Sequence, residues 1–134
     1  MLNEQQLQDL VNGMNARMQQ ERASQQLTLG QFIAALKELP PAAMVSGLGD
    51  LMSYRGYYCD LAFDPETREE TVAALLARCQ DAMGRTFEGY KGGDFLMGET
   101  TPLWVAPYGS SGERVMGLRV EGERVMVTLA TEHE

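Results

Sequence analysis

Three segments of the chain combine aromatic side chains with glycines and a basic residue. They span residues 53–58, 86–95 and 104–114, and they contain all five tyrosines and the only tryptophan. Aromatic rings stack on nucleobases, arginine and lysine bind phosphates, and glycine lets backbone N–H groups approach an anion. Together, the three segments predict a binding site for a small, nucleotide-like anion.

Basic residues within these segments are the candidates for contacting that anion. The chain has 11 basic and 19 acidic residues and a net charge of −8, so its overall field repels a negatively charged ligand. A binding site must therefore concentrate positive charge locally. Arg55, Lys91 and Arg114 are the residues that could supply it.

The same features also have structural interpretations, which the sequence leaves open. Tyr57 and Tyr58 alternate along an expected strand, so at least one of them faces the core. Trp104 can equally serve as an anchor for the sheet. Gly92 and Gly93 can simply form a hairpin turn.

Residues for catalysis or metal binding are sparse. His133, the single histidine, is the penultimate residue, and Cys59 and Cys79 are too few for a disulfide framework or a zinc site. The segment Gly84–Gly89 has P-loop spacing, but Tyr90 follows where lysine is required. We expect no enzyme activity, no catalytic residue, no metal and no cofactor, although clustered carboxylates leave acid–base chemistry open.

Composition bounds the class of protein. The 134 residues support one domain, spanning residues 1–134, with a core of its own. The acidic balance argues against DNA binding, and no apolar run approaches the ~20 residues of a membrane span. The polar N-terminus does not resemble a secretory signal, so we expect a cytoplasmic protein without a membrane partner.

A helical pattern covers residues 3–23 at the start of the chain. Most of its side chains are polar, and one narrow stripe is apolar. That stripe can pack on its own domain or, as part of a polar helix over residues 1–24, serve oligomer assembly. Its members are Leu7, Leu10, Val11, Met14 and Met18.

Two further helices are predicted over residues 29–38 and 68–83. Each begins with a capping box, in which a threonine is followed three residues later by a glutamine or glutamate. Pro40 and Pro41 end the first helix, and Gly84 ends the second. The capping pairs are Thr28 with Gln31, and Thr67 with Glu70.

The remaining segments are predicted to form a sheet. A strand beginning at Met44 turns at Gly47 and Gly49. A strand over 53–63 carries a bulge or a close backbone approach at Gly56 and ends at Asp64–Pro65. The fold class is therefore α+β, with N-terminal helices, one central helix and a mainly antiparallel sheet. The later strands span 95–97, 103–106, 113–120 and 123–130, the last two forming a hairpin around Glu121–Gly122.

The glycine- and tyrosine-rich motifs resemble a known family, the phage Thoeris anti-defence proteins of the first type. The similarity covers roughly residues 45–120. At Pro107–Gly109 the chain departs from the family pattern, so no contact is carried over to residues 107 and 108. The motifs that carry the resemblance are Ser53–Tyr58 with Asp60–Ala62, Phe87–Phe95, Thr101–Ala106 and Ser111–Gly112.

The resemblance implies a sponge. Such proteins bind cyclic ADP-ribose isomers, including glycocyclic ADP-ribose, which bacterial TIR-domain enzymes make as immune signals, and they hold these signals without cleaving them. The family is also associated with binding the cyclic trinucleotides of CBASS defence at a separate site. It forms homodimers that can assemble into hexamers, with the ADP-ribose-type ligand near the dimer interface.

The resemblance also implies roles for individual residues. Arg55 and Arg114 would hold phosphates, and Phe87 or Tyr90 would stack on adenine. The other residues expected at the pocket are Tyr54, Tyr58, Lys91, Gly92, Gly93 and Trp104.

The residues themselves leave two other functions open. One is a small enzyme that degrades cyclic nucleotides with carboxylates and a metal ion, which would show turnover and a metal requirement. The other is an acidic interaction protein, such as a DNA mimic, which would present a contiguous negative face.

Overall fold

Five strands close into a barrel in the computed structural model, which describes residues 3, 6 and 17–131. The pairings β2–β5 and β1–β7 are parallel, and the other three are antiparallel. The predicted α+β class is confirmed, with two parallel pairings that the sequence pattern did not reveal. In barrel order the strands are β1 (Met44–Ser53), β2 (Leu61–Thr71), β5 (Leu103–Val105), β6 (Glu113–Glu121) and β7 (Arg124–Ala130).

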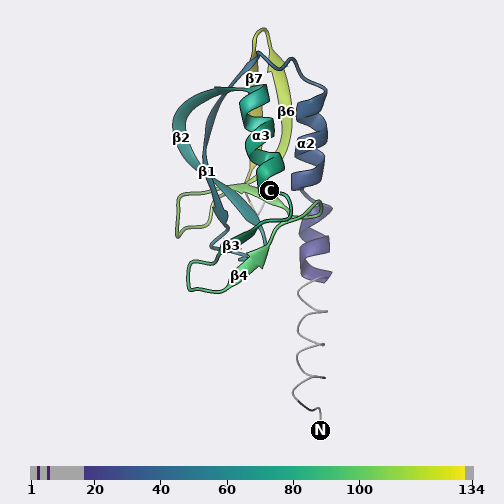
Figure 1. Cartoon of the computed structure of the whole chain (residues 1–134), viewed down its shortest axis with the longest axis vertical. Coiled ribbons are helices and arrows are strands. Elements are labelled where there is room, and N and C mark those ends of the chain that lie inside the picture. The colour runs from purple at the N-terminus through teal and green to yellow at the C-terminus, as the bar shows by residue number, and fades with distance from the viewer. Residues whose placement is uncertain (1–2, 4–5, 7–16, 132–134) are drawn as a thin grey trace.

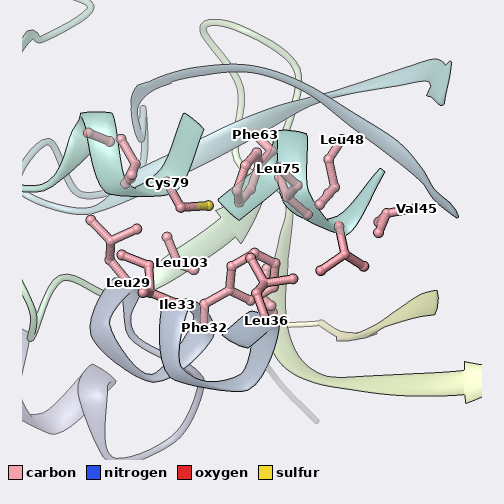
Figure 2. Packing of buried hydrophobic residues seen from close by; sticks show 14 of the residues in the cluster. Leu29, Phe32, Ile33, Leu36, Val45, Leu48, Phe63, Leu75, Cys79 and Leu103 are labelled. Carbon is pink, nitrogen blue, oxygen red and sulfur yellow. The ribbon is translucent and has the colours of Figure 1, made fainter. Parts of the chain in front are cut away.

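Two helices, α2 (Leu29–Lys37) and α3 (Val72–Ala82), lie side by side against the barrel (Figure 1). Their apolar faces meet side chains of the strands in one core, and the rings of Phe32 and Phe63 lie 5.8 Å apart between centroids (Figure 2). The core includes Leu29, Phe32, Ile33 and Leu36 of α2, Val72, Leu75 and Cys79 of α3, and Val45, Leu48, Phe63 and Leu103 of the strands.

The prediction for α2 is confirmed, capping box included, because the Thr28 side chain accepts from the backbone of Gln31 and the Gln31 side chain accepts in return. The predicted start of α3 is wrong by four residues. The N-cap is Thr71 rather than Thr67, and its hydroxyl accepts from the backbone N–H of Ala74 at 3.1 Å. Residues 67–70 belong to β2 instead, where strand pairing outweighs the local capping signal.

The predicted turn at Gly47 and Gly49 is also wrong, since β1 continues through both glycines. The register of β1 against β2 shifts on either side of Leu48, so the glycines mark irregularities within a strand. At Gly49 a side chain would collide with the neighbouring strand, because a Cβ there would lie 2.7 Å from the carbonyl oxygen of Asp64. Glycine is needed here for close approach rather than for a turn.

The predicted strand over residues 53–63 is only correct at its ends. Residues 54–60 form a loop that joins β1 to β2, so Gly56 lies in a loop. Of its two interpretations, the bulge is wrong and the close approach holds, since a Cβ there would lie 2.7 Å from the Tyr54 ring. Asp64–Pro65 does not end the strand, and β2 runs on to Thr71. Pro65 faces Leu48 at the register shift, where its missing N–H costs the sheet least.

A small hairpin of β3 (Thr86–Glu88) and β4 (Asp94–Leu96) stands apart from the barrel strands, at the end opposite the β6–β7 turn (Figure 1). The strands expected at 95–97 and 103–106 are found within a residue of their predicted bounds. The long C-terminal hairpin is confirmed as β6 and β7, with Gly122 in its turn.

Residues 17–23 are helical, in agreement with the last part of the predicted N-terminal helix. Of its apolar stripe, Leu7, Leu10, Val11 and Met14 lie outside the described residues, and Met18 is exposed. Its role in assembly stays a prediction. Among the described residues, no helix is long and apolar enough to cross a membrane.

Candidate functional site

The three segments singled out in the sequence meet in the structure. They form the loop 54–60, the β3–β4 hairpin and the loop between β5 and β6. The rings of Tyr58 and Phe95 lie 5.6 Å apart between centroids, and those of Tyr90 and Tyr108 lie edge to face at the same distance. Residues up to 50 positions apart in the chain therefore build one surface.

Beneath that surface lies an inner aromatic cluster of Tyr54, Tyr57 and Trp104. The Tyr54 and Trp104 rings stack with centroids 4.2 Å apart and an interplanar angle of 10°, and each residue is 1% exposed. The Tyr54 hydroxyl accepts from the backbone N–H of Gly112 at 3.0 Å, and the Trp104 indole donates to Asp60 at 2.9 Å. Of the two interpretations of Trp104, the structure supports the sheet anchor, and Tyr54 shares its burial.

The outer surface is a tyrosine patch, by which we mean Arg55, Tyr58, Tyr90 and Tyr108. The central guanidinium carbon of Arg55 lies 5.1 Å from the Tyr90 ring centroid and 5.7 Å from that of Tyr58. Tyr90 is 47% exposed and Tyr108 is 65% exposed. The patch thus offers ring surface to solvent beside a cation, which is the arrangement that recognises a base and a phosphate.

Gly109 allows the Tyr90 ring to lie close to the loop between β5 and β6. A Cβ at Gly109 would lie 2.9 Å from that ring, and the residue has a φ of +79°. Any other residue would push the ring away and strain the backbone. This glycine therefore contributes to the position of Tyr90 in the patch.

The charge around Arg55 distinguishes it from most arginines of the described chain. Arg55 and Lys91 have no carboxylate of the described residues within ion-pair distance, so the positive charge next to the tyrosine patch is not neutralised. The arginines that do pair with a carboxylate are Arg22, Arg68, Arg78, Arg85, Arg119 and Arg124.

Arg114, expected to hold a phosphate, is buried and has structural partners. Its Nε and Nη2 atoms donate to the backbone oxygen of Thr131 at 3.2 and 2.8 Å, and its Nη1 donates to the Gln25 side chain at 3.3 Å. These bonds tie β6 to the residue that follows β7. In this conformation Arg114 is not part of the tyrosine patch.

Phe87 and the two glycines lie outside the tyrosine patch. Phe87 is half-buried opposite Phe95 in the hairpin. Gly92 and Gly93 have positive φ angles and belong to the turn between β3 and β4, where the N–H of Gly92 donates to Gly89 at 2.9 Å. The hairpin-turn interpretation therefore accounts for both glycines.

Sequence reasoning missed the partnership of Asp60 with Arg22. Asp60 is fully buried, and its two oxygens accept from Nε and Nη2 of Arg22 at 2.7 and 3.0 Å. Burial acts to lower the pKa of Arg22, but the hydrogen bond and charge of Asp60 outweigh it and raise that pKa above its usual value. No sequence pattern links these positions, which lie 38 residues apart.

Cys59 lies beside this ion pair, with its sulfur 3.6 Å from Nη2 of Arg22. Burial, reinforced by the charge of Asp60, raises the pKa of the Cys59 thiol. The thiol is therefore held in its protonated form rather than activated as a nucleophile.

A separate cleft of about 340 Å³ lies where β1, α3 and β3 meet. Its two arginines are engaged, Arg78 with Glu70 at 2.6 Å and Arg85 with Asp81 at 2.9 Å. The described part of the chain contains no group of three or more residues suited to hold a metal ion. The cleft is lined by Asp50, Leu51, Arg78, Asp81, Arg85 and Phe87.

Comparison of the chain with protein-family models, with curated proteins and with solved structures finds no match.

Proposed function

We propose that this protein binds and sequesters a cyclic ADP-ribose-type signalling nucleotide in the cytoplasm of an infected bacterium, without cleaving it. The observation that carries the proposal is the position of Arg55, a cation beside the Tyr58 and Tyr90 rings with no carboxylate of the described residues paired to it. The resemblance to the phage anti-defence family supplies the ligand class.

The chemistry of the tyrosine patch fits the two ends of such a ligand. The exposed rings of Tyr90 and Tyr108 offer stacking surface for adenine, which is worth about 1–3 kcal/mol per base. The Arg55 guanidinium can bind a pyrophosphate through two parallel hydrogen bonds. Lys91, exposed and next to Tyr90 in the chain, adds a second positive charge.

Sequestration requires high affinity, because a sponge must hold the signal more tightly than the effector does. Nanomolar binding corresponds to about 12 kcal/mol, and such affinity for a small ligand favours an enclosed site. The tyrosine patch is open on a single chain, so a second copy that covers it would supply the enclosure. This agrees with the dimers and hexamers that the resemblance implies.

A capture experiment tests the proposal. The purified protein is mixed with glycocyclic ADP-ribose, free ligand is removed by filtration, the protein is heat-denatured, and the released molecules are analysed by mass spectrometry. We expect intact ligand in amounts stoichiometric with the protein. Recovery of a hydrolysed product would point to the degrading enzyme instead, and recovery of no ligand would contradict the proposal.

A further inference from the structure

Asp60 occupies a special place in the loop that carries Arg55 and Tyr58. It is the last residue of the loop 54–60, and among the described residues it is the only acidic residue that is buried. Its carboxylate accepts two hydrogen bonds from Arg22, one from the Trp104 indole and one from the Cys59 thiol, the last at 3.8 Å. A buried, hydrogen-bonded carboxylate therefore fixes one end of the loop.

Backbone bonds close the loop on itself. The N–H of Tyr54 donates to the carbonyl of Asp60 at 2.9 Å, and the N–H of Asp60 donates to the carbonyl of Tyr57 at 2.9 Å. The Ser53 hydroxyl donates to the carbonyl of Tyr58. The position of Asp60 thus fixes both ends of the segment in which Arg55 lies.

The helix over residues 17–23 contacts this loop at three positions. The Arg22 guanidinium lies 3.9 Å from the ring centroid of Tyr57, and the Gln19 side-chain amide donates to the carbonyl of Cys59 at 3.0 Å. With the ion pair to Asp60, the helix holds residues 57, 59 and 60, whereas Arg55 and Tyr58 in the same loop contact the β3–β4 hairpin.

We infer that Arg22 is a positioning residue, whose ion pair with Asp60 holds the loop 54–60 in the conformation that presents Arg55 and Tyr58 in the tyrosine patch. Docking of the helix and binding of an anion at the patch are then linked, so that each stabilises the other. The role of Arg22 in holding the loop follows from the contacts above, whereas its linkage to anion binding rests on the proposed function.

Hydrogen exchange of the full-length chain tests the statement about the loop. In Arg22→Ala we expect all protected amides to exchange faster, because the free energy of unfolding falls, and those of residues 54–60 to be accelerated about tenfold or more beyond the amides of β6 and β7. Arg22→Lys, which keeps the charge but lacks the two-pronged guanidinium, should restore part of the protection. The control is Arg124→Ala, which removes an exposed ion pair with Glu69 and should leave the loop unchanged.

Two exchange results would overturn the inference. One is unchanged exchange of residues 54–60 in Arg22→Ala, and the other is a uniform increase over the whole chain, which would mean a general loss of stability. If Arg22→Ala does not fold, Gln19→Ala removes a single hydrogen bond to the loop, and it should produce a smaller acceleration at the same amides.

The linkage to binding has its own readout, the affinity for glycocyclic ADP-ribose. We expect Arg22→Ala to bind at least about fivefold more weakly, although Arg22 lies beneath the loop and not in the patch. A loosened loop with unchanged affinity would overturn the linkage. If the unaltered protein binds no such ligand, the proposed function fails, and hydrogen exchange still decides the role of Arg22.

Discussion

Among the aromatic residues near Arg55, Tyr54 and Trp104 are almost fully buried, whereas Tyr58 is half-buried and belongs to the tyrosine patch. Tyr54, Tyr58 and Trp104 look alike in sequence, as aromatic residues near glycine and a basic side chain. The parallel pairing of β2 with β5 determines which of them are buried, because it sets Ala62 opposite Trp104 and the Tyr54 ring stacks on the indole. Such long-range register leaves no local trace in the sequence.

Tyr90 is predicted to contribute through its ring rather than its hydroxyl. Tyr90→Ala should weaken binding of the nucleotide about 5- to 150-fold, since one stacked base is worth about 1–3 kcal/mol. Tyr90→Phe should keep most of the affinity. Calorimetric titration of the two variants checks this, and an equal loss in both would show that stacking is not the contribution of Tyr90.

Asp60 is predicted to matter for stability far more than an exposed aspartate. Asp60→Asn leaves Arg22 without its charge partner and should lower the free energy of unfolding by about 3 kcal/mol or more. Asp81→Asn, which affects the exposed pair with Arg85, should cost less than about 1 kcal/mol. Urea unfolding measures both, and similar losses in the two variants would contradict this account of Asp60.

At the scale of elements, local signals predict some segments well and others poorly. The helix α2 has a regular apolar stripe, a capping box and a following proline pair, so all its signals agree. In β1 and β2, by contrast, glycines and Pro65 sit at register shifts, and they read as turns and strand ends until the partner strand is known. The position of the loop 54–60, which joins these two strands, follows from that pairing.

Gly56 is predicted to be required by the packing of the loop 54–60. Its Cβ would lie 2.7 Å from the Tyr54 ring, which is fixed by its stacking on Trp104. Gly56→Ala should therefore lower the free energy of unfolding by about 1–3 kcal/mol. At Gly98 a Cβ would meet no atom within 4 Å, so Gly98→Ala should keep or slightly raise stability. If thermal unfolding shows equal effects, the packing argument is wrong.

At the scale of the whole molecule, an acidic chain carries, in the loop that joins β1 to β2, an arginine with no carboxylate of the described residues within ion-pair distance. Two helices and the strands form the main core, and the residues of the tyrosine patch are not among its members. Stability and recognition therefore depend on largely different residues, which allows the site to be tested without unfolding the protein. The loop 54–60 contributes to both stability and recognition, because it contains the buried Asp60 as well as Arg55 and Tyr58.

The core should lose stability in alkaline solution through Cys79. Burial raises the pKa of Cys79 to about 12, whereas the unfolded chain has the ordinary thiol value of 9.0. Below pH 9.0 the thiol keeps its proton in both the folded and the unfolded chain, so the free energy of unfolding is not reduced there. Above that pH the unfolded chain releases the proton and the folded chain does not, so the free energy of unfolding falls as the pH rises toward about 12. At pH ~10.5 the loss should be about 2 kcal/mol relative to pH ~8. Cys79→Ala should flatten this part of the stability profile measured by urea unfolding, and an equally steep profile would contradict the assignment.

The most direct test of the tyrosine patch is a calorimetric titration of glycocyclic ADP-ribose into the unaltered protein, Arg55→Ala and Arg124→Ala. Arg55 has no carboxylate partner in the described chain, so its removal should leave the fold intact. It should cost the charge-assisted bonds to phosphate, about 1.5–3 kcal/mol or about 10- to 150-fold in affinity. The control variant Arg124→Ala, which loses only an exposed ion pair with Glu69 on β2, should bind the ligand as tightly as the unaltered protein does. Equal affinity of all three proteins would show that the ligand does not bind at the tyrosine patch.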